Sequence, residues 1–68
     1  MPKPTPTRQI IRVLQKKGFF FVSQRGSHAK FKKDGRTVIV PMHGKETPCG
    51  TVRSILRQSK LTEDDFKK

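Results

Sequence analysis

Residues 19–41 are FFFVSQRGSHAKFKKDGRTVIVP, three segments of aromatic, β-branched or alternating residues that two glycine-containing pairs separate. Aromatic and β-branched residues favour β-strands, and alternation of apolar with polar residues is typical of a strand with one buried face. Arg25-Gly26 and Asp34-Gly35 are tight-turn signals, because glycine adopts a positive φ without steric cost. We therefore expect a three-stranded antiparallel meander, with strands at about residues 19–25, 28–33 and 36–41.

A helical pattern precedes the predicted sheet. Four aliphatic residues recur there at helical spacing, namely Ile10, Ile11, Val13 and Leu14. Pro6 suits the first position of a helix that Thr5 caps, and Gly18 is typical of the residue that ends a helix. We expect a helix at about residues 6–17, preceded by a flexible tail at residues 1–5.

A second helical pattern follows the predicted sheet. Thr47-Pro48 repeats the pair of N-cap and proline, and an apolar stripe follows at Val52, Ile55 and Leu56. This pattern predicts a helix at about residues 48–59. Thr62 then precedes three acidic residues, which suit the positive end of a helix dipole. We expect a short C-terminal helical turn at about residues 62–66, with Phe66 packed against the core or against a partner.

The order helix, three strands, helix decides the fold class that we expect. Each helix has to bury an apolar stripe, and an antiparallel sheet offers one face for burial while the other face meets solvent. Both helices should therefore cover one face, as in the αβββα double-stranded-RNA-binding domains, an α+β fold. The opposite face carries His28, Lys30 and Lys32 and should be exposed and basic. Residues 6–68 are expected to form a single domain, since the chain is too short for two.

Charge narrows the class of partner. The 68-residue chain has 16 lysines and arginines against 5 aspartates and glutamates, a formal net charge of +11. Such a surface favours phosphate, so a nucleic acid is the preferred partner and an acidic protein is the alternative. No apolar run approaches the roughly 20 residues of a membrane helix, and residues 1–7 lack the apolar segment of a signal peptide. We therefore expect no membrane association and a cytoplasmic location.

His28 has the chemistry that a ribonuclease needs. It follows the predicted turn and faces outward beside Lys30, and histidine exchanges a proton near neutral pH without a cofactor. RNA carries its own nucleophile, the 2′-hydroxyl, so cleavage requires a proton acceptor, a proton donor and cations near the phosphate. The alternative for His28 is an ordinary surface histidine. His43 is either an acid partner of His28, a phosphate contact or a loop histidine that bonds to the backbone.

Other polar residues are candidates for supporting roles. Ser27 either hydrogen-bonds a phosphate or the imidazole, or stabilises the turn. Six cations are candidate RNA contacts, with a solvated charge as the alternative for each: Arg25, Lys30, Lys32, Lys33, Arg36 and Lys45. The histidines, the cysteine and the acids lack metal-ligand spacing, so we expect neither metal nor cofactor. Cys49 is expected to be an isolated buried thiol rather than a nucleophile.

Four blocks of the chain resemble the HicA toxin family, namely KGF at 17–19, QRGSH at 24–28, VIVPMHGKE at 38–46 and GTVRSIL at 50–56. The resemblance covers about residues 8–66. It implies a small mRNA interferase with the αβββα fold, the toxin of a type II toxin–antitoxin pair. It also implies metal-independent cleavage of RNA by the histidine of the Gly-Ser-His motif, here His28. A HicB-like antitoxin would bind the toxin and block that site.

Two positions depart from the pattern of this family. Phe20-Phe21 makes the first strand unusually aromatic, and Cys49 stands where a polar or basic residue is usual. An exposed Phe20 would indicate a patch that binds a partner. Two other functions stay open from the sequence: a non-catalytic RNA-binding module with a basic sheet face, and a purely protein-binding role with an acidic antitoxin as the main ligand. We expect the free protein to be a monomer.

Overall fold

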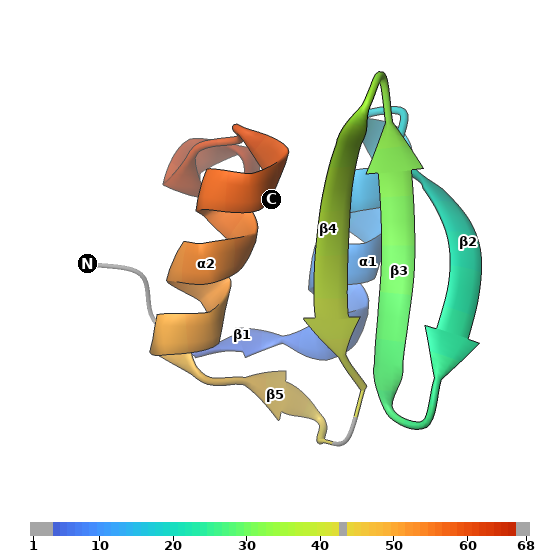
Figure 1. The fold of residues 1–68 in the computed structure, drawn as a ribbon. Coiled ribbons are helices and arrows are strands. Elements are labelled where there is room, and N and C mark those ends of the chain that lie inside the picture. The colour runs from blue at the N-terminus through green and yellow to red at the C-terminus, as the bar shows by residue number, and fades with distance from the viewer. Residues whose placement is uncertain (1–3, 43, 67–68) are drawn as a thin grey trace.

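The computed structural model describes residues 4–42 and 44–66 of the chain. The elements are, in order, β1 (Thr5–Pro6), α1 (Thr7–Lys16), β2 (Phe20–Arg25), β3 (His28–Lys33), β4 (Arg36–Pro41), β5 (Glu46–Thr47), α2 (Cys49–Ser59) and a 3-10 helix η1 (Glu63–Phe66). Figure 1 shows the three long strands side by side, with α1 behind them and α2 next to β4.

The main sheet is an antiparallel meander in the order β2-β3-β4. The second and third strands coincide with the predicted ranges, and the first begins at Phe20 instead of residue 19. The predicted Asp34-Gly35 turn is present, with φ values of 48° and 80°. The positive φ of both Asp34 and Gly35 is the geometry of a type I′ hairpin turn, whose twist matches that of the strands it joins. The turn predicted at Arg25-Gly26 consists of Gly26 and Ser27 instead, because Arg25 is the last residue of β2 and pairs with His28; Gly26 has the expected positive φ, 55°.

The end of α1 explains why β2 starts late. Gly18 has a φ of 98°, and its N–H donates to the Gln15 carbonyl, while the N–H of Phe19 donates to the Leu14 carbonyl. This pair of bonds is the Schellman motif, which satisfies the last carbonyls of a helix. Phe19 is buried and belongs to this helix end, so the strand pairing begins one residue later. The predicted role of Gly18 is thus confirmed.

One face of the sheet is buried by both helices, so the predicted α+β fold of the double-stranded-RNA-binding type is confirmed. In β3, Ala29 and Phe31 are buried while the alternating residues His28, Lys30 and Lys32 are exposed. The core contains residues of α1, of the segment between α1 and β2, of the sheet, of α2 and of η1: Ile10, Val13, Leu14, Phe19, Ala29, Phe31, Val38, Val40, Val52, Ile55 and Phe66. Gln58 of α2 also accepts a 3.0 Å hydrogen bond from the Ile39 N–H, which satisfies one backbone donor of the edge strand β4.

The two-stranded sheet of β1 and β5 was not predicted. Thr5 pairs with Thr47 in antiparallel register, so the assignment of Thr5 to a flexible tail and to an N-cap is wrong. Residues 1–3 of that tail lie outside the described residues. Helix α1 begins at Thr7 without a side-chain cap. Helix α2 begins at Cys49, and it too lacks a side-chain cap, because the predicted cap residue Thr47 belongs to β5. Pairing between residues about 40 positions apart leaves no local signal in the sequence.

The C-terminal turn is present as η1, and Phe66 is buried against the core. Its cap differs from the predicted one. Thr62 donates from its N–H and its hydroxyl to the Asp65 carboxylate, at 2.9 and 3.1 Å, so Asp65 is the acceptor. Lys17 lies 3.2 Å from the same carboxylate. The backbone hydrogen bond from Thr62, followed by the bond from Lys17, lowers the pKa of Asp65.

Candidate nucleic-acid interface

The sheet face opposite the helices is built by the register of three strands, and we call it the outer face. Residues directly opposite each other in antiparallel strands project from the same side. In β2 and β3 these pairs are Phe20 with Lys32, Ser23 with Lys30, and Arg25 with His28. In β3 and β4 they are Lys32 with Thr37, Lys30 with Ile39, and His28 with Pro41. The outer face therefore consists of Phe20, Ser23, Arg25, His28, Lys30, Lys32, Thr37, Ile39 and Pro41.

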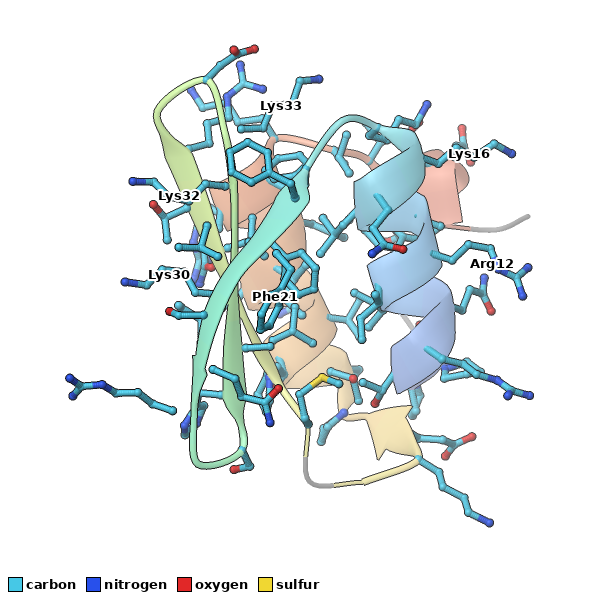
Figure 2. All side chains as sticks on the ribbon, turned by 90° about the vertical axis from the view of Figure 1, so that its right-hand side faces the viewer. Arg12, Lys16, Phe21, Lys30, Lys32 and Lys33 are labelled. Carbon is cyan, nitrogen blue, oxygen red and sulfur yellow. The ribbon has the colours of Figure 1, made fainter. Side chains whose placement is uncertain are left out.

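Cations on this outer face have no carboxylate among them. Arg25, Lys30 and Lys32 are exposed, and none of the nine outer-face positions is acidic. Figure 2 shows Lys30 and Lys32 extending from the sheet on the side away from α1. Within residues 4–42 and 44–66, no hydrogen bond or ion pair engages the side chains of these three cations. Close positive charges repel one another, so an anion bound between them lowers the electrostatic energy.

His28 lies at one end of this cationic surface. It is the first residue of β3, its side chain is exposed, and it pairs with Arg25 on one side and Pro41 on the other. The turn before it is held at two points: the Met42 N–H donates to the Ser27 carbonyl, and Gln24 Nε2 donates to the Gly26 carbonyl at 3.0 Å. The backbone of His28 is thus anchored while its ring is open to a ligand.

The two predicted helpers of His28 differ in what the structure describes. Ser27 is half-buried in the β2–β3 turn, next to His28, and its carbonyl has the structural role of accepting the Met42 N–H. Its part in binding RNA stays a prediction. His43 lies outside the described residues, so its predicted role as acid partner or phosphate contact also stays a prediction.

Three of the six predicted cations lie away from this surface. Lys33 Nζ donates to the Lys17 carbonyl at 2.6 Å and lies 5.9 Å from the centre of the Phe19 ring, so it ties the sheet to the end of α1. Arg36 pairs with Lys33 at the far end of the sheet. Lys45 lies in the segment before β5, where its carbonyl accepts the Thr7 N–H. The structure brings together only Arg25, Lys30 and Lys32 with His28.

The structure also has basic features that the sequence patterns did not single out. Arg12 and Lys16 of α1 form a second basic region, which Figure 2 shows on the side of the molecule opposite Lys30 and Lys32. A groove of about 630 Å³ lies between the start of α1 and the β5 segment, and its lining includes Arg8. The pairing of β1 with β5 creates this groove, so no local sequence signal was available to predict it.

Cys49 is exposed, so the expectation of a buried thiol is wrong. It is the first residue of α2, and the buried positions of that helix begin one turn later, at Val52. Across the part of the chain that the structure describes, no three residues of the types His, Cys, Asp and Glu form a group suited to a metal ion. The thiol therefore has no neighbouring set of ligands in that part of the chain.

A family model described as the HicA toxin of bacterial toxin–antitoxin systems matches residues 7–61. The chain belongs to the HicA toxin family. The matched range starts with α1 and ends just after α2, so it contains the whole β2-β3-β4 sheet and His28. Membership of the HicA family identifies the chain as a toxin of such a system and implies an antitoxin as partner. A search of curated proteins found no match. No helix within the described residues is long and apolar enough to cross a membrane.

Proposed function

We propose that this HicA toxin is a metal-independent endoribonuclease that cleaves mRNA at the outer face, with His28 as the catalytic acid or base. One observation carries the proposal: an exposed imidazole stands beside Arg25 on a face that also bears Lys30 and Lys32 and has no carboxylate. Phosphate attracts these cations, and a proton carrier among them meets the scissile linkage. Membership of a toxin family supports an activity that harms the cell, as cleavage of mRNA would.

The reaction follows from the chemistry of RNA. The 2′-oxygen attacks the adjacent phosphorus while the bond from phosphorus to the 5′-oxygen breaks, which leaves a 2′,3′-cyclic phosphate and a 5′-hydroxyl. One proton leaves the 2′-hydroxyl and one proton must reach the 5′-oxygen, and His28 performs one of these two transfers. Arg25 and Lys30 neutralise the charge that accumulates on the phosphoryl oxygens, a contribution that increases in the transition state. His43 or water completes the second proton transfer.

The test is RNA cleavage by His28→Ala in the presence of a chelator. Loss of a general acid or base lowers the rate by about 10²–10⁴-fold, and His28 is exposed, so the variant should keep the fold. Thr37→Ala is the matched control, because Thr37 lies exposed on the same face without a proposed role. Cleavage by purified, folded His28→Ala at the rate of Thr37→Ala would refute the role of His28.

A second candidate function is RNA binding without cleavage, which the cations of the outer face support by themselves. This function predicts binding that weakens steeply with salt and leaves RNA intact. Mapping the ends of the RNA separates the two functions, because fragments that end in a 2′,3′-cyclic phosphate arise only from cleavage by the 2′-hydroxyl. The absence of such fragments with the wild-type protein would favour the binding module.

We also propose that a HicB-like antitoxin covers the outer face. The positive charge of that face suits an acidic protein surface, and a bound protein there would exclude RNA from His28. Adding the antitoxin should stop both cleavage and RNA binding. Simultaneous binding of RNA and antitoxin would contradict this placement.

A further inference from the structure

Phe20 is exposed and, among the residues that the structure describes, has no ring contact of the kind that its neighbours Phe19 and Phe21 make with the rest of the fold. Phe19 is 3% exposed in the core, and the ring of Phe21 makes an edge-to-face contact with Phe31, with centroids 5.9 Å apart. Phe20 is 60% exposed, the largest value among the exposed large hydrophobic residues that the structure describes. An apolar ring in water is unfavourable relative to burial. Burial in the core therefore accounts for Phe19, and the contact with the buried Phe31 accounts in part for Phe21, but neither accounts for Phe20.

The register places this ring on the same side as the cations. Phe20 lies directly opposite Lys32, and the pairs Ser23–Lys30 and Arg25–His28 follow along the two strands. Successive residues of a strand project to opposite faces, so Phe21 projects toward α1, as Figure 2 shows, while Phe20 is on the outer face. The outer face thus combines one exposed aromatic ring with a row of positive charges.

The separation between ring and imidazole suits a short length of RNA. Lys32 and His28 are four residues apart in β3, which corresponds to about 13 Å at roughly 3.3 Å per residue. A stacked nucleic-acid strand advances about 3.4 Å per nucleotide. RNA that places a phosphate at His28 and runs along β3 therefore reaches Phe20 within about four nucleotides, and within fewer when the strand is extended. Lys30 lies between these two points and can contact a phosphate of the same strand.

We propose that Phe20 is a stacking platform for an unpaired RNA base, and that the outer face accordingly selects single-stranded over duplex RNA. The inference rests on the proposed function in that RNA occupies the outer face. Proteins that bind single strands combine a positive surface with aromatic rings on which bases stack. Bases inside an A-form duplex already stack on each other, so a duplex leaves Phe20 uncovered. A partner protein that buried the ring would instead need an apolar patch around it. The other apolar residues of the outer face, Ile39 and Pro41, are half-buried and lie on β4, which β3 separates from Phe20.

Fluorescence gives a direct test, because the chain has no tryptophan and no tyrosine. Phe20→Trp introduces a single fluorophore at an exposed site, and Phe21→Trp introduces it one residue away on the opposite face, where the exposed fraction is a similar 52%. Both are made in the His28→Ala background, so that the RNA stays intact. Unpaired RNA of about eight nucleotides should quench the emission of the Phe20→Trp protein. It should leave the Phe21→Trp protein unchanged, and the same sequence in a duplex should quench neither.

Affinity provides the second measurement. Phe20→Ala in the His28→Ala background should weaken the binding of unpaired RNA by roughly 5- to 150-fold, the range expected for loss of one base stack. Phe20→Tyr retains a ring and should bind as tightly as Phe20, whereas Phe20→Leu retains apolar area only and should bind like Phe20→Ala. The affinity for duplex RNA should change less than twofold in all three.

The outcomes separate this inference from the proposed function. Unpaired RNA that binds without quenching the Phe20→Trp protein and with equal affinity for Phe20→Ala overturns the inference, while cleavage by His28 is unaffected. Equal quenching by duplex RNA also overturns it, and so does a Phe20→Ala defect confined to antitoxin binding. Conversely, His28→Ala that cleaves at the control rate refutes the proposed function, and base stacking on Phe20 is judged by the binding data alone.

Discussion

Replacing Thr7 with valine removes a hydroxyl that joins the β1–β5 pair to the start of α1. Thr7 Oγ1 donates to the Gly44 carbonyl at 3.1 Å and lies 2.9 Å from Thr47 Oγ1. A hydroxyl has one proton. Because the Thr7 hydroxyl donates its proton to the Gly44 carbonyl, the Thr47 hydroxyl must be the donor in the bond between the two threonines. Both threonines are buried. Valine has nearly the same shape as threonine, so the substitution changes the hydrogen bonds far more than the packing.

The two single variants should differ in their effect on the free energy of unfolding. Thr7→Val leaves the buried Thr47 hydroxyl without an acceptor, and an unsatisfied buried polar group costs about 1–3 kcal/mol. Thr47→Val keeps the hydrogen bond from the Thr7 hydroxyl to the Gly44 carbonyl and removes only the bond between the two threonines, which is worth about 0.5–1.5 kcal/mol net. The double variant no longer contains the Thr47 hydroxyl that Thr7→Val leaves without an acceptor. Its loss of stability should therefore be smaller than the sum of the losses of the two single variants.

Thermal and urea unfolding of the three variants measure these differences. In a domain of this size 1 kcal/mol corresponds to about 4–8 °C in Tm, so the Thr7→Val shift is readily resolved. Thr37→Val, on the exposed side of β4, is the matched control and should stay within about 0.5 kcal/mol of wild type. If Thr7→Val resembles this control, or if the single losses add without coupling, the hydrogen-bonded joint between Thr7 and Thr47 does not exist in solution.

Two further substitutions test the ends of α1 and of the chain. Gly18→Ala should destabilise the protein by about 1–2 kcal/mol in chemical denaturation, because Gly18 has a φ of 98° and the new Cβ would lie 3.2 Å from Lys33 Cε. Gly50→Ala, in α2 with open space around the site, should be neutral or stabilising by up to about 1 kcal/mol, and a matching loss there would contradict the strain argument. Asp65→Asn tests the lowered pKa of Asp65: its contribution to stability is present above the ordinary value of 3.8 and disappears as the pH falls through the lower folded pKa. The Tm difference between wild type and Asp65→Asn should therefore be present at neutral pH and vanish in strong acid, and a difference that persists in acid would argue against this linkage.

Prediction from the sequence succeeded where neighbouring residues determine the structure. The Asp34-Gly35 turn joins strands that are adjacent in the chain, so their pairing and register follow from a local signal. Alternation along β3 then separates Lys30 from Phe31, which is why the exposed position of His28 and its lysines could be predicted. The family resemblance was confirmed over residues 7–61.

Prediction failed where a residue's partner is distant in the chain. Lys33 looks like one more surface cation, yet it bonds to the end of α1 through the Lys17 carbonyl. Thr5 looks like a cap and pairs with Thr47 instead. Cys49 looks like a core residue because it is small and apolar, but its exposure depends on where α2 meets the sheet. None of these outcomes is encoded in the residues on either side.

The amino-acid sequence alone determined the order of the elements, the faces of the long strands and a basic surface that bears a histidine, because turn geometry and side-chain alternation act over a few residues. Only the tertiary structure decided which cations stand beside His28, that Phe20 shares their face, and that β1 closes on β5. These features depend on strand register and on contacts between segments that are distant in the chain. Such contacts stabilise the protein only when the whole core assembles.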